Sequence, residues 1–481
     1  MIERYNLADD LSISRVLTGL WQIADLERDN KTLDPTKTAA YLQPYVEAGF
    51  TSFDMADHYG SAEIITGTFK NSNPLGHKVQ LFTKWVPTPK VTSKEQVRVA
   101  ISRSLERMKA DQLDLLQYHA WNYCDPEWLD SMFWLQELKE EGIIKHIGVT
   151  NFDASHLQVA IASGIEIITN QISYSLIDQR AYHQMSATCK KYGVRLLAYG
   201  TLAGGFLSER WLNTPEPQQD NLETWSQMKY KRFINEAGGW VAFQKVLSIV
   251  HQIAQKHHST IANISSRYML DQAHVAGIIL GARLGISNHM EENKEIFQLE
   301  LTQKDKEDIH NSISSLSPIP GNCGDEYRKP PFLTAAGDLS DHLDILEPVY
   351  ATTQDDRRTK IHSGTIWEDL AGYSRAIKRG NRIFVSGTTA THRDRLIGGD
   401  DPAAQTHFII DKIQASIESL GGTLADVDRT KIMIHDMNDW EAVARAHGER
   451  FKDIRPANTM IQAGLIGDGY KVEIEAEATL H

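Results

Sequence analysis

Four polar residues of this chain stand where short apolar runs end, and their types suit acid–base chemistry. Asp54 and Tyr59 come from one such run and the loop beyond it, and Lys84 and His119 close the next two runs. A free tyrosine has a pKa of ~10, and a neighbouring ammonium favours its phenolate and lowers that pKa. Asp54 would hold the ammonium of Lys84 in place, and His119 could hydrogen-bond a substrate oxygen. The set predicts a proton-transfer site.

Elements with a repeating pattern must bring these residues together. Short apolar runs predict eight strands, at residues 16–20, 51–53, 79–83, 113–118, 143–149, 166–171, 194–199 and 275–280. Amphipathic stretches between them predict helices, at residues 35–48, 94–108, 126–141, 154–163 and 181–192. Four of these helices are followed directly by a glycine that can end a helix in the left-handed conformation, namely Gly49, Gly142, Gly164 and Gly193.

This order of elements predicts an α/β fold, a (β/α)8 TIM barrel of ~250 residues plus insertions, preceded by a hairpin. An open doubly wound sheet is the competing fold. It would normally carry a Gly-x-Gly-x-x-Gly turn after its first strand if it bound a dinucleotide, and the sequence has none. Because the carboxyl ends of barrel strands face one mouth, Asp54, Lys84 and His119 are expected to converge there with Tyr59.

The length of 481 residues predicts two domains. We expect the barrel in residues 1–340, a connection in 341–359 and a second domain in 360–481. Prolines and glycines cluster from 317 to 359, where the periodicity fails. Beyond it, strands are expected at 382–386, 431–434, 458–462 and 472–478, and helices at 405–420 and 440–451. This order predicts a small α+β domain with its helices on one face of a sheet.

The composition narrows the class of protein. A hydrophobic share of 41% and a charged share of 23% are typical of a soluble globular protein. The net charge of −13 argues against a nucleic-acid surface. The three cysteines form no CxxC pair, no metal-binding or Walker motif is found, and no run of about 18 apolar residues or signal-peptide core is present. We therefore expect a cytoplasmic protein that holds no metal and binds no membrane.

Several motifs in order resemble the aldo-keto reductases over about residues 1–340. They are residues 53–60, Lys84 with Trp85, His119, residues 148–152 and residues 199–202. The resemblance implies that Tyr59 is the general acid–base, that Asp54 and Lys84 tune it, and that His119 orients a carbonyl group.

The same resemblance implies a nicotinamide cofactor at the barrel mouth. Asn151 and Gln171 would bind its carboxamide beside Thr150, and Tyr199 would stack on its ring. The cofactor-binding residues implied are Thr150, Asn151, Gln171, Tyr199, Gly200, Thr201, Leu202, Gly281, Arg283, His289 and Asn293. A guanidinium suits a ribose 2′-phosphate, so Arg283 favours NADP(H) over NAD(H).

Three tryptophans and two stretches of the chain are candidates for the substrate pocket. Trp21, Trp85 and Trp121 follow strands, and we expect that they either line an apolar pocket or only pack within the barrel. Residues 322–339 could close that pocket. Residues 205–240 hold three further tryptophans and form either a lid over a ligand or a loop that these tryptophans pack down.

Residues 360–480 resemble the Rid family, also called YjgF. The matching motifs are residues 371–376, 383–387, 405–406, 420–422, 426–427, 455–457 and 472–476. Members resemble chorismate mutase in fold and form trimers with clefts between subunits. Imine-hydrolysing members clamp a carboxylate with an Arg after Pro-Ala, where this chain has Asn458. Tyr373 and Glu473 remain at family site positions, so we expect a module that trimerises and binds a small ligand or an imine.

These observations favour an NADP(H)-dependent reductase of an aldehyde or ketone, assembled as a homotrimer through its C-terminal domain. One alternative is a nicotinamide-binding sensor or assembly protein with vestigial turnover. The other is a bifunctional reductase and imine deaminase.

Overall fold

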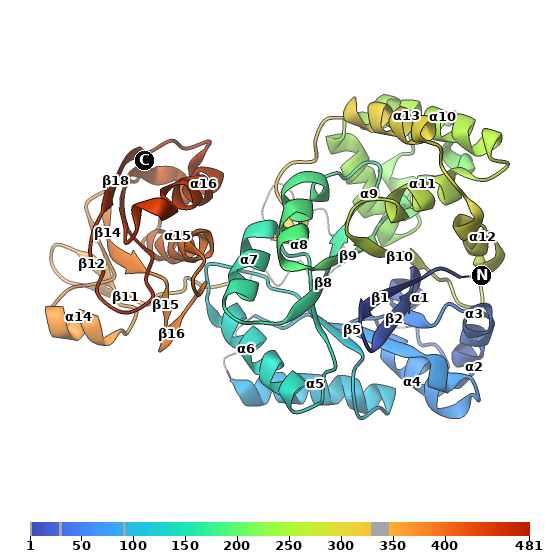
Figure 1. The fold of residues 1–481 in the computed structure, drawn as a ribbon, viewed down its shortest axis with the longest axis horizontal. Helices are drawn as coiled ribbons and strands as arrows, with labels where there is room; N and C mark the ends of the chain where they lie inside the picture. The colour runs from blue at the N-terminus through green and yellow to red at the C-terminus, as the bar shows by residue number, and fades with distance from the viewer. Residues whose placement is uncertain (1, 28–30, 90–92, 329–345) are drawn as a thin grey trace. The chain divides into compact units, whose positions relative to one another are not determined.

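The computed structural model describes residues 2–27, 31–89, 93–328 and 346–481. The chain divides into two compact units (Figure 1). One holds the barrel strands, and the other holds the sheet of the carboxyl-terminal region together with residues 122–133 and 155–165. No helix in these ranges is long and apolar enough to cross a membrane.

Eight parallel strands close the barrel in chain order, and the last strand pairs with the first. The strands are β3 (Val16–Gly19), β4 (Ser52–Asp54), β5 (Gln80–Trp85), β6 (Leu115–Tyr118), β7 (Ile147–Thr150), β8 (Ile167–Ser173), β9 (Arg195–Tyr199) and β10 (Val275–Gly281). The predicted TIM barrel is confirmed. The strand predicted at 143–149 begins later, because Ile144 makes only an isolated bridge to Leu113.

The strand register aligns polar residues at the carboxyl end of the barrel. Asp54 of β4 lies beside Gly19 of β3, and Lys84 of β5 lies beside Gln117 of β6. Thr150 of β7 is paired with Gln171 of β8. The five polar side chains named here are all buried, so the barrel mouth contains a group of polar side chains shielded from water.

A hairpin covers the other end of the barrel. Its strands β1 (Arg4–Ala8) and β2 (Leu11–Ser14) are antiparallel, as expected. Leu11 and Ile13 of β2 pack against apolar residues near the starts of β3, β6 and β10. Complete burial of such a side chain contributes about 1.5–3 kcal/mol, so the hairpin stabilises the end of the barrel that lies away from the mouth.

The longer helices of the barrel follow its strands (Figure 1). They are α4 (Ala62–Ser72), α5 (Lys94–Met108), α6 (Glu127–Glu140), α7 (Ala154–Ala162), α8 (Ser186–Tyr192), α10 (Gly239–Lys256), α11 (Ile261–Leu270) and α13 (Gln303–Ser314). The helix predicted at 35–48 is instead α2 (Pro35–Ala39) and α3 (Gln43–Ala48), joined by a 3-10 turn. Pro44 explains the break, because it has no N–H to donate to the preceding turn.

Residues 205–240 combine short 3-10 turns with the helix α9 (Trp225–Glu236). The rings of Trp211 and Trp240 lie 4.9 and 5.9 Å from that of Phe206. These two tryptophans therefore pack the loop down. Trp225 has a different neighbour, since its ring lies 5.8 Å from that of Trp21, the first residue of the helix α1 (Trp21–Leu26) that follows β3.

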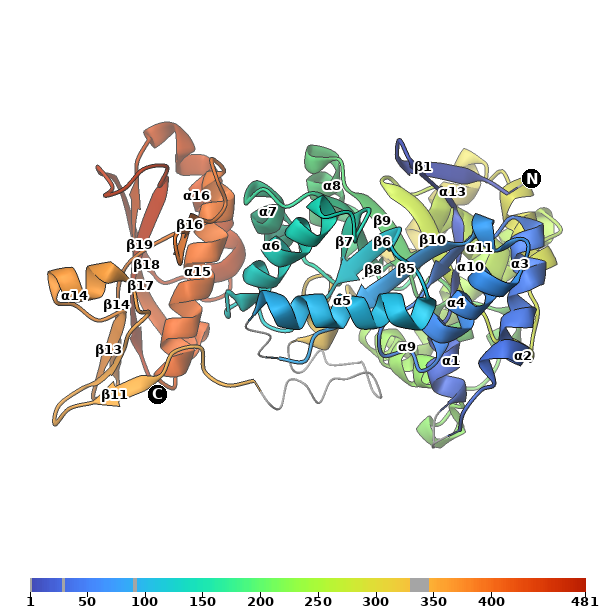
Figure 2. The ribbon, with the colours of Figure 1, turned by 90° about the horizontal axis from the view of Figure 1, so that it is seen from below.

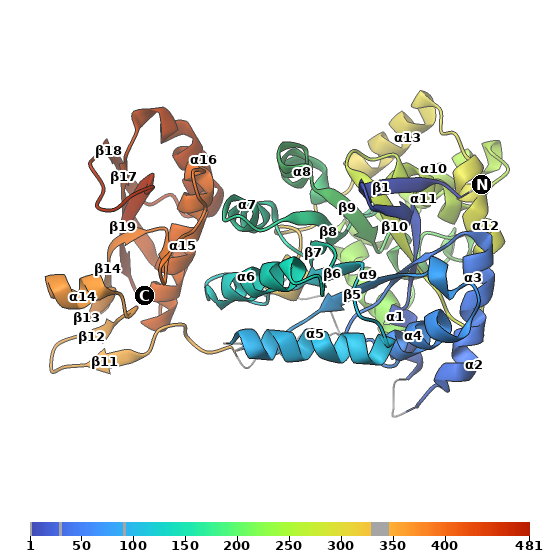
Figure 3. The same cartoon turned by 60° about the horizontal axis from the view of Figure 1, so that its bottom comes forward.

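The carboxyl-terminal unit holds a seven-stranded sheet in the order β11-β12-β13-β14-β19-β17-β18. Its strands are β11 (Thr352–Gln354), β12 (Thr359–Ile361), β13 (Ala376–Arg379), β14 (Arg382–Thr389), β17 (Val427–Ile434), β18 (Ala457–Gln462) and β19 (Val472–Thr479). The helices α15 (Pro402–Ser419) and α16 (Trp440–Phe451) lie on one face of it (Figures 2 and 3). The predicted α+β architecture is confirmed.

The start of this sheet lies earlier in the chain than the sequence indicated. Strand β11 and the first residue of β12 fall within 341–359, the stretch expected to be a connection. The two strands pair in antiparallel fashion and β12 pairs with β13. Hydrophobic periodicity could not reveal β11, because all three of its residues are exposed.

Candidate functional site

The centre of the candidate active site is a buried ion pair beside a tyrosine ring. The Lys84 ammonium lies 2.8 Å from Oδ2 of Asp54, and it donates a second hydrogen bond of 2.8 Å to the carbonyl oxygen of Met55. The same nitrogen lies 4.8 Å from the centroid of the Tyr59 ring. Three of the four residues expected from the sequence are thus brought together. A cation in this position stabilises negative charge on the phenol oxygen, which makes proton donation easier.

The loop that carries Tyr59 is fixed at both ends. At its start, backbone bonds join Met55 to Phe82 and Asp57 to Lys84 of β5. At its end, Glu27 accepts bonds from the backbone N–H and the hydroxyl of Ser61, at 2.8 and 2.6 Å.

Gly60 is required in this loop for two reasons. Its φ is +53°, and a Cβ there would lie 2.1 Å from the Glu27 carboxylate. Beside the loop, the Trp21 ring meets the Tyr59 ring edge-on at 4.9 Å. Backbone geometry and packing therefore hold Tyr59 in position.

Two buried amides orient the carboxylate of Asp54. Its Oδ1 accepts hydrogen bonds from Gln171 at 2.7 Å and from Gln117 at 3.3 Å. The side-chain amide of Gln171 also donates to the side-chain oxygen Oε1 of Gln117 at 3.0 Å. Sequence reasoning missed Gln117. Its alignment with Lys84 on the neighbouring strand is the signal that could have found it.

His119 follows β6 and lies between aromatic rings. Its ring meets those of Trp121 at 4.5 Å and Tyr327 at 5.7 Å, both edge-on. Trp121 is fixed by a 2.8 Å bond from its indole N–H to the carbonyl of Pro87. Trp85 packs instead against Tyr118 at 5.4 Å. Of the three tryptophans assigned to the pocket, Trp21 and Trp121 therefore contact candidate catalytic residues.

The residues expected to bind the nicotinamide are hydrogen-bonded to one another or to their neighbours. Asn151 has a φ of +59°, and its side-chain oxygen accepts a 2.7 Å bond from the Tyr199 hydroxyl. The Thr150 hydroxyl donates to the backbone carbonyl of Gln171 at 3.1 Å. Burial raises the pKa of Tyr199 well above its ordinary value, helped by Tyr327 and Glu326. Tyr199 therefore remains a protonated donor.

The chain turns sharply after β9. Gly200 has a φ of +69°, and a Cβ there would lie 1.9 Å from the Tyr230 hydroxyl. The carbonyl of Leu202 accepts a 2.9 Å bond from Gly205. The Thr201 hydroxyl is buried and has no hydrogen-bond partner in the described ranges. This turn thus leaves one polar group for a ligand.

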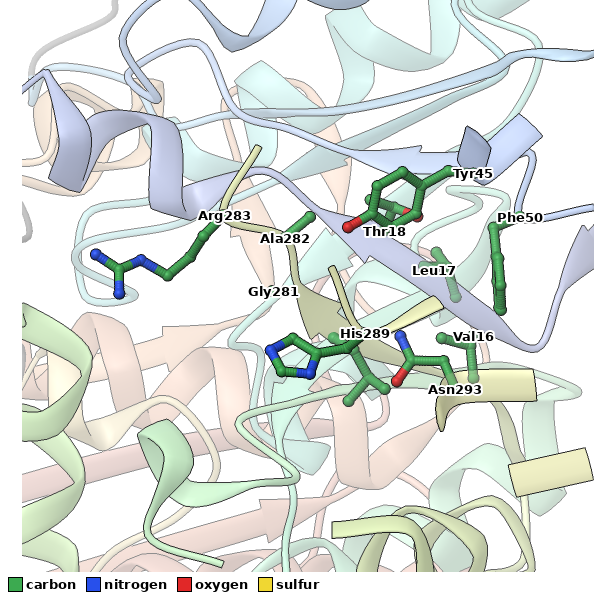
Figure 4. A pocket seen from close by; sticks show the side chains of 11 residues that line it. Val16, Leu17, Thr18, Tyr45, Phe50, Gly281, Ala282, Arg283, His289 and Asn293 are labelled. Atoms are coloured by element: carbon green, nitrogen blue, oxygen red, sulfur yellow. The ribbon is translucent and has the colours of Figure 1, made fainter. Parts of the chain in front are cut away.

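A pocket at the end of β10 holds the residues expected at the adenosine end of a cofactor. It is lined by Val16, Leu17, Thr18, Tyr45, Phe50, Leu280, Gly281, Ala282, Arg283, His289 and Asn293. Figure 4 shows His289 and Asn293 near one another, with Arg283 reaching away from Phe50.

The polar side chains of this pocket differ in whether they have a hydrogen-bond partner within the protein. The Nε of Arg283 is buried without a hydrogen-bond partner within the described part of the chain. His289 is exposed and pairs with Glu292 at 2.8 Å. Asn293 lies on the short helix α12 (Met290–Glu295). An unsatisfied guanidinium nitrogen suits a phosphate oxygen, so these residues fit a nucleotide.

The first residues of the segment expected to close the pocket, 322–328, lie at the mouth. Arg180 bonds the carbonyl of Asn322 at 2.8 Å and the Glu326 carboxylate at 2.7 Å. Arg328 bonds the carbonyls of Ala120 and Asn151, both at 2.7 Å. The rest of the segment that was expected to close the pocket, residues 329–339, lies outside the described ranges.

In the carboxyl-terminal unit the three expected site residues, Asn458, Glu473 and Tyr373, each contact a different neighbour. The Asn458 amide, on the exposed strand β18, donates to the Thr430 hydroxyl at 2.9 Å. The Glu473 carboxylate packs on Gly387, where a Cβ would lie 2.0 Å from its oxygen. Burial raises the pKa of Glu473, and the nearby Arg375 opposes this shift. Burial lowers the pKa of Arg375, and the nearby Tyr373 is among the groups that oppose this shift.

Comparison with known proteins finds one family model for the barrel and another for the carboxyl-terminal region. The family model "Aldo/keto reductase family" matches residues 15–313, and the model "Endoribonuclease L-PSP", which describes the Rid/YjgF proteins, matches residues 367–480.

Two reductases are among the similar proteins. The 6-dehydroglucose reductase of Agrobacterium fabrum is 30% identical over 230 residues, which cover 43% of this chain and 73% of that protein. The NADH-specific methylglyoxal reductase of Escherichia coli is 25% identical over 296 residues, 57% of this chain and 87% of that protein.

A crystal structure of a thermostable aldo-keto reductase with epalrestat shares the barrel fold. Its TM-score is 0.51 at 22% identity, over 65% of this chain and 99% of that one. The family match spans more than half of the 481 residues. This chain belongs to the aldo/keto reductase family, and it is an oxidoreductase fused to a Rid/YjgF domain.

Proposed function

We propose that this protein reduces an aldehyde or ketone, with Tyr59 as the proton donor and NADPH as the preferred cofactor. The observation that carries the proposal is the Lys84 ammonium, 2.8 Å from the Asp54 carboxylate and 4.8 Å from the Tyr59 ring. Such an arrangement lowers the cost of leaving negative charge on the phenol oxygen. General acid catalysis of this kind contributes typically 10²–10⁴-fold to a rate.

Each residue has a separate role in the proposed reaction. Tyr59 gives its proton to the carbonyl oxygen of the substrate, and Lys84 stabilises the phenolate that remains. His119 donates a hydrogen bond to the same carbonyl oxygen and orients it. Trp21 and Trp121 exclude water from the site by covering the sides of Tyr59 and His119. A bound nicotinamide would supply a hydride, which brings two electrons and one hydrogen to the carbonyl carbon while the proton from Tyr59 goes to the oxygen.

The preference for NADPH rests on Arg283. Its buried Nε lacks a partner in the described ranges, and a guanidinium can bind a phosphate dianion through two hydrogen bonds. Asn293 lines the same pocket and suits an adenine ring. The name of the Escherichia coli relative specifies NADH, so both nucleotides belong in the assay.

The proposal is tested by Tyr59→Phe, which removes only the hydroxyl. We expect kcat/KM for aldehydes to fall about 10³-fold or more, while NADPH still quenches tryptophan fluorescence with an unchanged Kd. Tyr268→Phe is the matched control, because Tyr268 is a buried tyrosine on α11. A Tyr59→Phe variant that keeps its rate contradicts the assignment. Tight NADPH binding without turnover of any carbonyl would favour the sensor function instead.

We further propose that the Rid/YjgF domain forms a trimer and binds a small ligand. The exposed edge strand β18 supports this, because an unpaired strand edge readily pairs with another chain. Light scattering on the full chain is expected to give three times the mass of the 54.2 kDa chain. A monomer at micromolar concentration would contradict it. Asn458 cannot supply a charged bidentate clamp, so no hydrolysis of amino-acid-derived imines is expected.

A further inference from the structure

A buried carboxylate lies just after the loop that carries Tyr59. Glu63, in the first turn of α4, is 1% exposed. One of its oxygens accepts a 2.7 Å hydrogen bond from the buried hydroxyl of Thr83, and the other accepts a 3.1 Å bond from Arg107 of α5. Arg107 itself is half-buried. None of these three residues has a role in the proton transfer proposed above.

Arg107 also bonds the loop itself. The same nitrogen, Nη1, donates a 2.7 Å hydrogen bond to the backbone carbonyl of Asp57, two residues before Tyr59. The backbone N–H of Asp57 donates to the carbonyl of Lys84 at 3.0 Å. Asp57 is therefore held from α5 through its C=O group and from β5 through its N–H group.

The same hydrogen bonds reach the strand that carries the lysine. Thr83, which bonds Glu63, directly precedes Lys84 in β5. One path of bonds thus runs from Arg107 through Glu63 to Thr83, and another from Arg107 through Asp57 to Lys84. A polar network that is fully hydrogen-bonded is rigid and favours one arrangement. The loop of the proposed proton donor is therefore tied to the strand of the proposed cation.

The packing of α4 on α5 has other contacts to support it. The two helices lie side by side (Figures 2 and 3), and a Cβ at Gly67 of α4 would lie 2.4 Å from the Cα of Met108. The Asn71 amide bonds the carbonyls of Gly67 and Met108 at 2.8 and 3.2 Å. The contact that distinguishes the pair of Arg107 and Glu63 is therefore its contact with the loop.

We propose that Arg107, paired with Glu63, is a positioning residue for Tyr59, because it holds the loop where the Lys84 ammonium can stabilise the phenolate. This inference rests on the proposed carbonyl reduction and adds a residue that acts through the loop. The attraction between two charges falls as their distance grows, and a displacement of ~1 Å at a reacting group can lower a rate about 10²-fold. The position of the loop therefore sets the rate of proton donation.

The test compares two replacements of nearly equal length at Arg107. Arg107→Met removes the donor, and we expect kcat for aldehydes with NADPH to fall about 10–100-fold, with KM and the NADPH Kd within about threefold. The solvent isotope effect on kcat should increase, because proton donation becomes the slower step. Arg107→Lys should keep kcat within about threefold of the wild type, since one nitrogen makes both bonds and an ammonium has three donors.

A double variant separates positioning from stability. Arg107→Met leaves the buried Glu63 carboxylate without its ion pair, which by itself destabilises a fold. In Arg107→Met/Glu63→Gln no buried charge remains, and the Gln oxygen can still accept the bond from Thr83. The double variant should melt close to the wild type and still lose kcat, because the carbonyl of Asp57 lacks its donor. All assays are run well below the lowest melting temperature.

Two further variants are controls. Arg98→Met removes a guanidinium from the same helix, where Arg98 pairs with Glu141 at the surface at 2.7 Å, and it should leave kcat unchanged. Asn71→Leu removes the amide that joins α4 to α5, so it should lower Tm and leave kcat unchanged.

The outcomes separate the two proposals when the wild type and Tyr59→Phe are measured alongside. A double variant that keeps its kcat overturns the inference, and so does an Arg107→Lys variant as slow as Arg107→Met. An equal loss of kcat in Asn71→Leu also overturns it, because loosened helices would then explain the effect. If Tyr59→Phe abolishes turnover and the Arg107 variants do not lower it, only this inference fails. If Tyr59→Phe keeps the wild-type rate, the proposed reduction fails, and this inference with it.

Discussion

The two ends of the barrel mouth satisfy their polar groups in opposite ways. At the proposed catalytic end the Asp54 carboxylate accepts bonds from Lys84, Gln171 and Gln117, all within the protein. At the proposed nucleotide end the Nε of Arg283 is buried without a partner in the described ranges. His289, which lines the pocket at that end, is exposed and pairs with the exposed Glu292.

This difference fits the role proposed for each end. A proton donor needs its neighbours fixed before the substrate arrives, because electrostatic stabilisation is largest when the groups need not reorganise. A binding site instead needs donors whose desolvation is compensated only when the ligand is present. The closed network at Asp54 and the unsatisfied Arg283 therefore predict effects on rate at one end and on nucleotide affinity at the other.

Removing the ammonium of Lys84 should have the largest effect. Lys84→Met leaves the phenolate of Tyr59 without its stabilising charge, and we expect kcat/KM to fall about 10³-fold. The NADPH Kd, measured by fluorescence, should stay within about threefold. A thermal melt must accompany the assay, because the variant leaves the buried Asp54 without its ion pair. If Lys84→Met lowered kcat/KM and NADPH affinity by similar factors, the proposed division into a catalytic end and a nucleotide end would be contradicted.

Removing the guanidinium of Arg283 should have the next largest effect, on affinity. Arg283→Leu is expected to weaken NADPH binding about 10–100-fold, since hydrogen bonds to charged groups contribute about 1.5–3 kcal/mol. NADH binding should change little, because NADH lacks the 2′-phosphate. His289→Ala is the control at the same pocket, and its effect should stay within about threefold because an exposed pair contributes little. An equal loss of affinity for NADPH and NADH would mean that Arg283 binds a part of the cofactor other than the 2′-phosphate.

Gln117→Leu should have the smallest effect of the three and tests whether the closed network matters. It removes the weaker of the two amide donors to Asp54, at 3.3 Å, and leaves that of Gln171. We expect kcat to fall about tenfold with KM and the NADPH Kd unchanged. Gln80→Leu is the control, because Gln80 begins the strand β5 away from the mouth and bonds Ser12 and Ser52. An unchanged kcat would mean that Gln171 alone orients the carboxylate.

Local sequence was sufficient for much of the fold and of the candidate site. The apolar runs that end in Asp54, Lys84 and His119 marked strand ends, because parallel strands buried on both sides read as short continuous apolar segments. Glycines marked helix ends, as at Gly49 and Gly193, which both have positive φ. The break at Pro44 was also present in the sequence, although the amphipathic pattern hid it.

The amino-acid sequence by itself therefore determined the family, the two-part organisation and the identity of the polar residues at the mouth. Tertiary structure alone decided which of those residues touch. Gln117 reaches Asp54 because the barrel register places it beside Lys84. Tyr327 meets Lys229 across 98 positions of sequence. No local pattern encodes either contact, since both depend on closure of the barrel and on how the loops after its strands fold over one mouth.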